Sequence, residues 1–152
     1  MELLARAGDN NRMVMHARSR RSKLVDWSSR METGISEIDQ QHKQLVDLVN
    51  QLSEAMYTGK GRDMLDHTLA SLEKYALFHF GTEERLMAMH CYSEAASHKR
   101  GHESFIDDIR RFRRRFDAGC IFPVEIMFFL REWIIYHIMM SDRDLGQTLA
   151  RA

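Results

Sequence analysis

Seven side chains of the types that bind metal ions recur along this 152-residue chain at short spacings. They are five histidines and two carboxylates: His42, His79, Glu83, His98, His102, His137 and Asp142. His79 and Glu83 are four residues apart, as are His98 and His102, and residues at this spacing share one face of an α-helix. Each pair can therefore point at one common object, and the pattern predicts a metal site.

The alternative is that these histidines belong to an ordinary core, because a single buried histidine is more often hydrogen-bonded than metal-bound. Burying five imidazoles and two carboxylates together without a cation would, however, leave unpaired polar groups in a low-dielectric core. One ion offers about four to six positions, so seven donors predict two ions that share the carboxylates as bridges. If three histidines serve one ion and two the other, the second ion keeps an open position for a small ligand. Imidazole and carboxylate ligands suit iron, manganese or zinc.

The elements that must position these residues are long helices. From Ile35 onward, apolar residues recur at steps of three and four, the spacing of one helix face. The expected helices span Ile35 to about Met56, about Arg62 to Met89, about Glu94 to Phe116, and Pro123 to about Ala150. Four such helices with short connections predict an all-α fold, an up-down-up-down antiparallel four-helix bundle, whose core is a usual place for a metal site.

The first residues of the chain differ from the rest. Residues 1–25 carry a basic run that ends at Lys23, and they lack a sustained period apart from a short helical pattern at Glu2–Ala7. We interpret residues 1–25 as an N-terminal extension and residues 26–152 as the bundle domain.

The pair on the fourth helix poses a geometric problem. His137 and Asp142 are five residues apart, which places them about 140° apart around an ideal α-helix. Either a local π-type turn lies between them, with Met140 and Ser141 in the bulge, or Asp142 reaches back from a tilted last turn. A single π-turn supplies the extra residue, and such turns are frequent at functional sites.

The composition argues against a nucleic-acid-binding protein and against a membrane-spanning one. Lys plus Arg and Asp plus Glu both number 22, so the net charge is zero and no basic excess suggests nucleic acid as a partner. The run Arg110–Arg115 follows Asp107 and Asp108, as on a salt-bridged solvated helix face. We find no transmembrane stretch or secretory signal, and we expect Cys91 and Cys120 to be ordinary thiols of a cytoplasmic protein.

At the motif level the chain resembles the hemerythrins, in particular bacterial hemerythrins, over about residues 26–150. The matching motifs are Ile38-Asp-Gln-Gln-His-Lys-Gln-Leu45, His79-Phe-Gly-Thr-Glu83-Glu, His98-x3-His102 and His137-Ile-x3-Asp142, with Trp27 and Thr33-Gly-Ile35 upstream. The resemblance implies a non-heme di-iron centre with a bridging oxo or hydroxo group that binds O2 reversibly. It also implies that His98, His102 and His137 serve one iron, that His42 and His79 serve the other, and that Glu83 and Asp142 bridge them.

The resemblance also suggests where O2 would sit. The family commonly has a leucine three residues before the last histidine ligand, and this chain has Ile134 there. The apolar residues expected to line the O2 pocket are those beside the ligands in sequence: Ile38, Leu45, Phe80, Trp133 and Ile134. Each of them could equally be plain core packing.

Three functions are compatible with this site. The first is reversible O2 binding for storage, delivery or buffering, which is not an enzymatic activity. The second is an O2- or redox-sensing module that reports to a protein partner, although no fused signalling domain is evident. The third is a di-iron redox enzyme, such as a peroxidase or nitric-oxide reductase, which would need a protic group in the pocket. Among polar residues, Glu84 and Tyr136 adjoin ligands in sequence.

Overall fold

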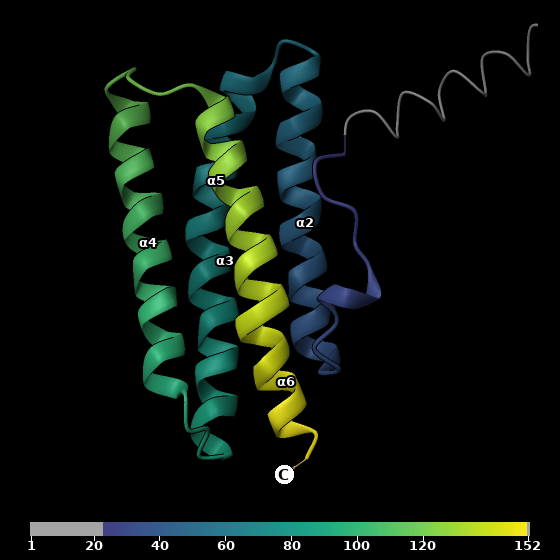
Figure 1. The fold of residues 1–152 in the computed structure, drawn as a ribbon. Helices are drawn as coiled ribbons and strands as arrows, with labels where there is room; N and C mark the ends of the chain where they lie inside the picture. Colours follow the sequence, from purple (N-terminus) through teal and green to yellow (C-terminus); the bar gives the residue numbers. More distant parts are fainter. Residues whose placement is uncertain (1–22, 152) are drawn as a thin grey trace, which may run out of the picture.

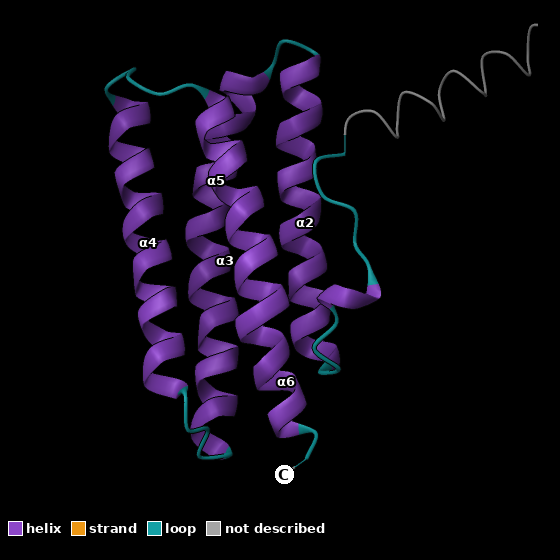
Figure 2. Ribbon diagram, viewed as in Figure 1, coloured by secondary structure: helices purple, strands orange, loops and turns teal. Residues whose placement is uncertain are grey.

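The computed structural model describes residues 23–151, and these residues form helices joined by short loops (Figure 2). The first three long helices are α2 (Ser36–Tyr57), α3 (Gly61–Met89) and α4 (Ala95–Asp117). The fourth is built from three consecutive segments, α5 (Pro123–Tyr136), the π-helix η2 (His137–Asp142) and α6 (Arg143–Leu149), and a short 3-10 turn, η1 (Ser29–Met31), precedes α2. The helical pattern at Glu2–Ala7 lies outside the described residues.

The long helices run alternately up and down, so that the α2–α3 and α4–α5 loops lie at one end and the α3–α4 loop lies at the other (Figure 1). The predicted antiparallel four-helix bundle is therefore confirmed, and each predicted helix end agrees with the structure to within one residue. Gly59 and Gly119, which follow α2 and α4, have φ angles of +75° and +70°. This left-handed conformation favours glycine and ends each helix.

Two apolar clusters fill the bundle at different levels. The larger one includes buried leucines and isoleucines from all four long helices: Leu45, Leu52, Leu65, Leu69, Leu72, Ile109, Ile126, Leu130 and Ile134. The smaller one lies toward the other end and consists of Ile38, Met87, Tyr92 and Leu145. Along each helix, the metal-binding residue types of the sequence pattern fall between these clusters, so apolar packing above and below fixes their level.

The segment before α2 runs along the outer side of that helix (Figure 1). The side-chain oxygen of Asn50 accepts hydrogen bonds from the backbone N–H groups of Leu24 and Val25, at 2.8 and 3.0 Å. Further along, Asp39 Oδ1 accepts from both the backbone N–H and the hydroxyl of Thr33, at 2.7 and 2.9 Å. These bonds attach the segment to α2 at two levels. Within residues 23–151, no helix is both long and apolar enough to cross a membrane.

Candidate metal centre

Two groups of buried metal-ligating side chains lie in the middle of the bundle, and they share two carboxylates. The larger group consists of Glu83, His98, His102, His137 and Asp142. The smaller group consists of His42, His79, Glu83 and Asp142. Within each group, one potential ligand atom per residue lies within 4.8 Å of all the others, and every member is buried. The fold thus brings together all seven residues that the sequence pattern singled out.

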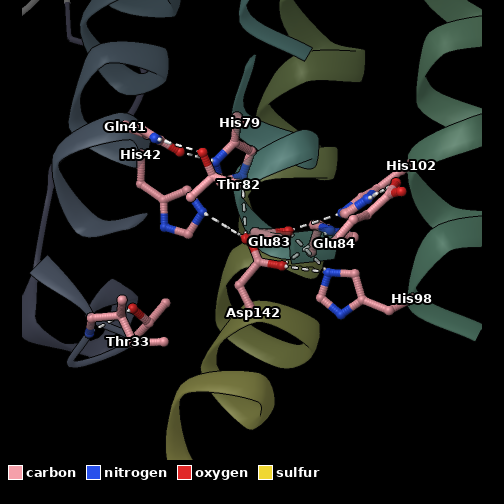
Figure 3. A network of polar contacts seen from close by, with 12 residues as sticks. Thr33, Gln41, His42, His79, Thr82, Glu83, Glu84, His98, His102 and Asp142 are labelled. Carbon is pink, nitrogen blue, oxygen red and sulfur yellow. Dashed lines mark hydrogen bonds and ion pairs between the residues drawn. The ribbon is translucent and has the colours of Figure 1, made fainter. Parts of the chain in front are cut away.

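Glu83, on α3, turns one carboxylate oxygen toward each group (Figure 3). Its Oε2 atom lies 2.9 Å from Nε2 of His102 and 3.1 Å from Nε2 of His98. Its Oε1 atom lies 3.3 Å from Nε2 of His79 and 3.8 Å from Nε2 of His42. A carboxylate placed in this way can contact two ions at once.

Asp142, at the end of η2, divides its oxygens in the same manner. Its Oδ1 atom lies 3.1 Å from Nε2 of His137 and 3.2 Å from Nε2 of His98. Its Oδ2 atom lies 3.0 Å from Nε2 of His42 in the other group. The two carboxylates therefore link the groups from opposite helices, α3 and η2.

The approach of Asp142 to His137 depends on the π-helix between them. The chain forms a π-helix from His137 to Asp142, where α-helix precedes and follows it. One turn with i→i+5 hydrogen bonds brings residues five apart onto the same face. The predicted π-type turn is confirmed, and it explains how a five-residue spacing serves the same centre as the four-residue spacings elsewhere.

Hydrogen bonds on the outer side of two rings fix their orientation. Nδ1 of His79 lies 2.8 Å from Oε1 of Gln41, and Nε2 of Gln41 donates to the hydroxyl of Thr82 at 3.2 Å. The Thr82 hydroxyl donates its only proton to the carbonyl of Phe78 at 3.1 Å, so it must accept from Gln41. The oxygen of Gln41 then faces His79, which places the ring proton on Nδ1 and leaves the Nε2 lone pair free for a metal.

His102 has a charged partner in place of an amide. Its Nδ1 atom lies 3.4 Å from Oε1 of Glu84, and Nζ of Lys99 lies 3.0 Å from Oε2 of the same carboxylate. Glu84 is partly exposed, whereas Gln41 is buried. Glu84 is one of the two polar residues that adjoin a predicted ligand in sequence. In the structure it contacts the outer nitrogen of the His102 ring and helps to orient that ring.

Aromatic rings stack on three of the five imidazoles. Phe80 lies on His102 with ring centroids 3.8 Å apart and an interplanar angle of 5°. Trp133 lies on His137 at 4.4 Å and 16°. Tyr75 lies on His79 at 5.0 Å and 23°. These contacts restrict ring rotation, and they give two of the predicted pocket residues, Phe80 and Trp133, a place against ligand-type side chains.

The other predicted pocket residues are fully buried. Leu45 and Ile134 belong to the larger apolar cluster, and Ile38 belongs to the smaller one. They therefore lie on both sides of the two groups along the bundle axis. This apolar enclosure lowers the local dielectric and limits the access of water to the centre along the bundle axis.

Burial and mutual repulsion shift the pKa values of the clustered side chains, beginning with two of the histidines. Burial, together with the nearby charge of His42, lowers the pKa of His79 to about 3. Burial, together with the charges of His137 and His98, lowers the pKa of His102 to about 2. These rings are therefore neutral near pH 7, which is the form that binds metals.

The pKa values of Glu83 and His98 are raised, whereas that of Asp142 is lowered. Burial and the charge of Asp142 raise the pKa of Glu83 to about 8. Burial alone would raise the pKa of Asp142, but the charge of His137, whose Nε2 atom lies 3.1 Å from Oδ1, holds it well below its usual value. Burial alone would lower the pKa of His98, but its bonds to Asp142 and Glu83 raise it to about 9.

Buried polar atoms without hydrogen-bond partners face the centre from both groups. Among the described residues they include Nε2 of four rings and one or both oxygens of the carboxylates: His42, His79, His102, His137, Glu83 and Asp142. An unsatisfied buried polar atom is costly, so a concentration of them on one spot requires an occupant that accepts lone pairs. Divalent cations fit this donor set, which has the nitrogen and oxygen chemistry of iron, manganese or zinc sites.

Three residues at this site were not singled out by the sequence pattern. Gln41 and Thr82 act on His79 across the α2–α3 interface, and the hydroxyl of Tyr75 is buried without a partner among residues 23–151. Tyr75 lies four residues before His79 and Thr82 lies three residues after it, so both share a helix face with this histidine. This spacing is the sequence feature that could have identified them. By contrast, His67 and His90 are exposed, as expected, and so are Cys91 and Cys120, whereas His16 lies outside the described residues.

Comparisons with known proteins agree with this geometry. The family profile of the hemerythrin HHE cation binding domain matches residues 33–149. The chain is 34% identical to a bacteriohemerythrin of Stenotrophomonas maltophilia over 120 residues, which are 79% of this chain and 78% of the relative. It is 30% identical to a bacteriohemerythrin of Methylococcus capsulatus over 129 residues, covering 84% of this chain and 98% of the relative.

A solved structure of a wild-type hemerythrin superimposes with a TM-score of 0.75 at 29% identity, covering 84% of this chain and 98% of the other. The buried histidine, glutamate and aspartate cluster is of the kind typical of hemerythrin di-iron sites. On the profile match, the relatives and the geometry of the cluster, the chain belongs to the hemerythrin HHE cation binding domain family.

Proposed function

We propose that this protein binds O2 reversibly at a non-heme di-iron centre and thereby stores, delivers or buffers O2. The observation that carries the proposal is the sharing of Glu83 and Asp142 by two groups of unequal size. The larger group offers five donors and the smaller offers four. An ion in the smaller group would have one protein ligand fewer, and so a position for a small molecule.

The ligand assignment follows the same division. His98, His102 and His137 would hold one iron, and His42 and His79 would hold the other. Glu83 and Asp142 would bridge the two irons, since each carboxylate turns one oxygen toward each group. All five rings face the centre through Nε2, which is consistent with this assignment.

Two iron ions at these ligands would supply the electrons that O2 takes up on binding and returns on release. The contribution of the chain is to orient the ligands and to keep water out. Gln41 and Glu84 hold two of the rings, and the apolar residues proposed for the pocket are Ile38, Leu45, Phe80, Trp133 and Ile134. A dry pocket would protect the O2-bound centre, because water cannot readily displace the bound ligand before its electrons are returned.

Metal analysis tests the ligand set. We expect two iron ions per chain in protein purified without chelators, and a loss of metal in His79→Ala, where neighbouring donors are left buried and unpaired. His67→Ala is the matched control, because His67 is an exposed histidine on the same helix. Equal metal content in His79→Ala and the control would refute the assignment.

An optical cycle tests the O2 function itself. The reduced protein is exposed to air and then to vacuum or argon, and its visible absorption is recorded through several cycles. Reversible appearance and loss of an O2-dependent band supports O2 binding. Irreversible conversion on the first exposure would argue for redox chemistry instead.

The second candidate is a di-iron redox enzyme, which one observation favours. Tyr75 supplies the protic group that such chemistry needs: its hydroxyl is buried, unpartnered among the described residues and carried on a ring stacked against His79. Burial and the charges of Glu83 and Asp142 raise its pKa well above the usual value, so the hydroxyl stays protonated near pH 7 and can donate a hydrogen bond. If peroxide turnover by the reduced protein falls in Tyr75→Phe while O2 affinity is unchanged, the enzymatic role is supported.

A further inference from the structure

Among the proposed ligands, His137 has the most exposed side chain. The side chains of His98 and His137 are 2% and 6% exposed, whereas those of the other five are at most 1% exposed. These two rings lie 5.0 Å apart, edge to face, on α4 and at the start of η2. Solvent therefore comes nearest to the candidate centre at the ring of His137, beside His98.

These two rings form part of the wall of a groove with a volume of about 570 Å³. Ser97, Gly101 and Ser104 line it from α4, and Trp133, Tyr136 and Met140 line it from the α5–η2 helix. We call this feature the His98–His137 groove. It connects bulk water with two ligand rings of the larger group.

The absence of a side chain at Gly101 keeps the ring of His137 open to the groove. A Cβ atom built at Gly101 would lie 3.3 Å from Cε1 and 3.5 Å from Nδ1 of His137. Any larger residue would therefore press on the ring at the point where the groove meets it. Glycine leaves that edge uncovered.

The lining of the groove carries oxygen atoms suited to a hydrated cation. Glu94 and Asp144 contribute carboxylates, and Ser97, Ser104 and Ser141 contribute hydroxyls. Tyr92 donates its hydroxyl proton to Oδ2 of Asp144 at 2.8 Å, which fixes the position of that carboxylate in the lining. Hard divalent cations prefer oxygen ligands and water while they remain hydrated, and acidic residues raise their local concentration.

We propose that the His98–His137 groove is the route by which divalent metal ions reach the buried ligands. This inference rests on the metal centre in the proposed function. A closed donor set needs a path for the ion, and this groove joins the exposed carboxylates of Glu94 and Asp144 to the most exposed ligand ring, that of His137. The ion would pass from these carboxylates to the edge of His137, beside His98, and from there to the shared carboxylates.

A matched groove elsewhere provides the control. A groove of similar volume, about 570 Å³, lies over α2 and α3, and its lining includes Ser71, His67 and Tyr75 but none of the seven proposed ligands. A bulky residue placed there should change surface shape without obstructing the proposed route. Ser71→Trp is thus the counterpart of Ser97→Trp and Ser104→Trp.

The test measures the rate of Co²⁺ uptake by the metal-free full-length chain, followed by stopped-flow absorption. We expect Ser97→Trp and Ser104→Trp to slow uptake by about tenfold while the final metal content stays unchanged, and Ser71→Trp to match the unaltered protein. Glu94→Gln should slow uptake to a smaller extent, and added salt should abolish that difference. Circular dichroism of each variant establishes that the bundle is folded.

Each remaining outcome contradicts the proposal. Equal uptake rates in all variants would show that the ion enters through general opening of the bundle. Equal slowing by Ser71→Trp would show that the effect is unrelated to this groove. If the unaltered protein takes up no metal at all, the metal centre itself is wrong and the route falls with it, which separates the two failures.

Discussion

The side-chain oxygen of Gln41 lies 2.8 Å from Nδ1 of His79, in a buried contact that joins α2 to α3. Thr82 determines which end of the amide faces His79, because its own proton is committed to the carbonyl of Phe78. The contact therefore selects one tautomer of a proposed ligand. Outer hydrogen bonds of this kind hold a metal-binding ring in place and raise its basicity.

Removal of this partner should weaken metal binding. In Gln41→Leu we expect the affinity for one of the two ions to fall by about 10–100-fold, since Nδ1 of His79 loses its buried acceptor. Thr82→Val should have a smaller effect, because the amide of Gln41 remains but can then turn either end toward the ring. Competition titrations with a coloured chelator measure both affinities, and ¹⁵N spectra of the metal-free protein report the tautomer. An unchanged tautomer and affinity in Gln41→Leu would show that the contact is only packing.

The sequence predicts which residues gather in the two buried groups, because their pattern is local. Spacings of four residues place His79 with Glu83 on one helix face, and the five-residue spacing of His137 and Asp142 left a π-turn and a reach from a tilted last turn as the two alternatives. Gln41 and Thr82 are different, because Gln41 is adjacent to one proposed ligand and yet contacts another on a neighbouring helix. That relationship depends on how α2 and α3 are rotated against each other, which one helix period does not specify.

The proposed pocket residue Ile134 gives a test with a built-in comparison. Ile134→Ala should shorten the lifetime of the O2-bound form, because a cavity beside the centre admits water. Ile126→Ala is the control, since Ile126 is equally buried, lies on the same helix and precedes Ile134 by two turns. Both variants should lose about 2–5 kcal/mol of unfolding free energy. If both decay equally fast in air, Ile134 serves only as core packing.

Alanine substitutions at two glycines, Gly146 and Gly81, should have opposite effects on the free energy of unfolding. A Cβ atom at Gly146 on α6 would lie 2.1 Å from the backbone oxygen of Thr33, so the helix can approach that segment only with glycine there. Gly146→Ala should therefore lower the free energy of unfolding by about 1–3 kcal/mol. Gly81 lies on an exposed face of α3, where an added Cβ atom would meet no atom within 4 Å outside its own stretch of helix, and Gly81→Ala should raise stability by about 0.5–1 kcal/mol. Chemical denaturation measures both, and a loss in Gly81→Ala would contradict the assigned surroundings.

The metal-free protein should be most stable near pH 6.5. The folded-state pKa values of His79 and His102 are lowered to about 3 and about 2, so these rings cost stability as the pH falls below about 6.5. The pKa values of Glu83 and His98 are raised from 4.5 to about 8 and from 6.5 to about 9, so each group lowers the stability as the pH rises from its usual pKa to its folded-state pKa. Below about pH 6.5 the gain from the two neutral rings outweighs the loss from Glu83, and above it only the losses remain. Thermal unfolding of the metal-free chain across this range tests the expected maximum. A steady rise in stability up to pH 9 would contradict it.

Metal loading near pH 7 should release about two protons per chain, because a ligand must lose its proton to bind. Glu83 and His98, with pKa values raised to about 8 and about 9, hold protons in the metal-free protein at this pH, whereas His79 and His102 are already neutral. Zn²⁺ addition in weak buffer with a pH indicator counts the protons, and Zn²⁺ affinity should rise with pH until about pH 9. Release of no protons would mean that Glu83 and His98 are already deprotonated before metal binds. The metal-free protein would then bury two negatively charged carboxylates, those of Glu83 and Asp142, close together. Another positively charged group would have to offset the repulsion between them.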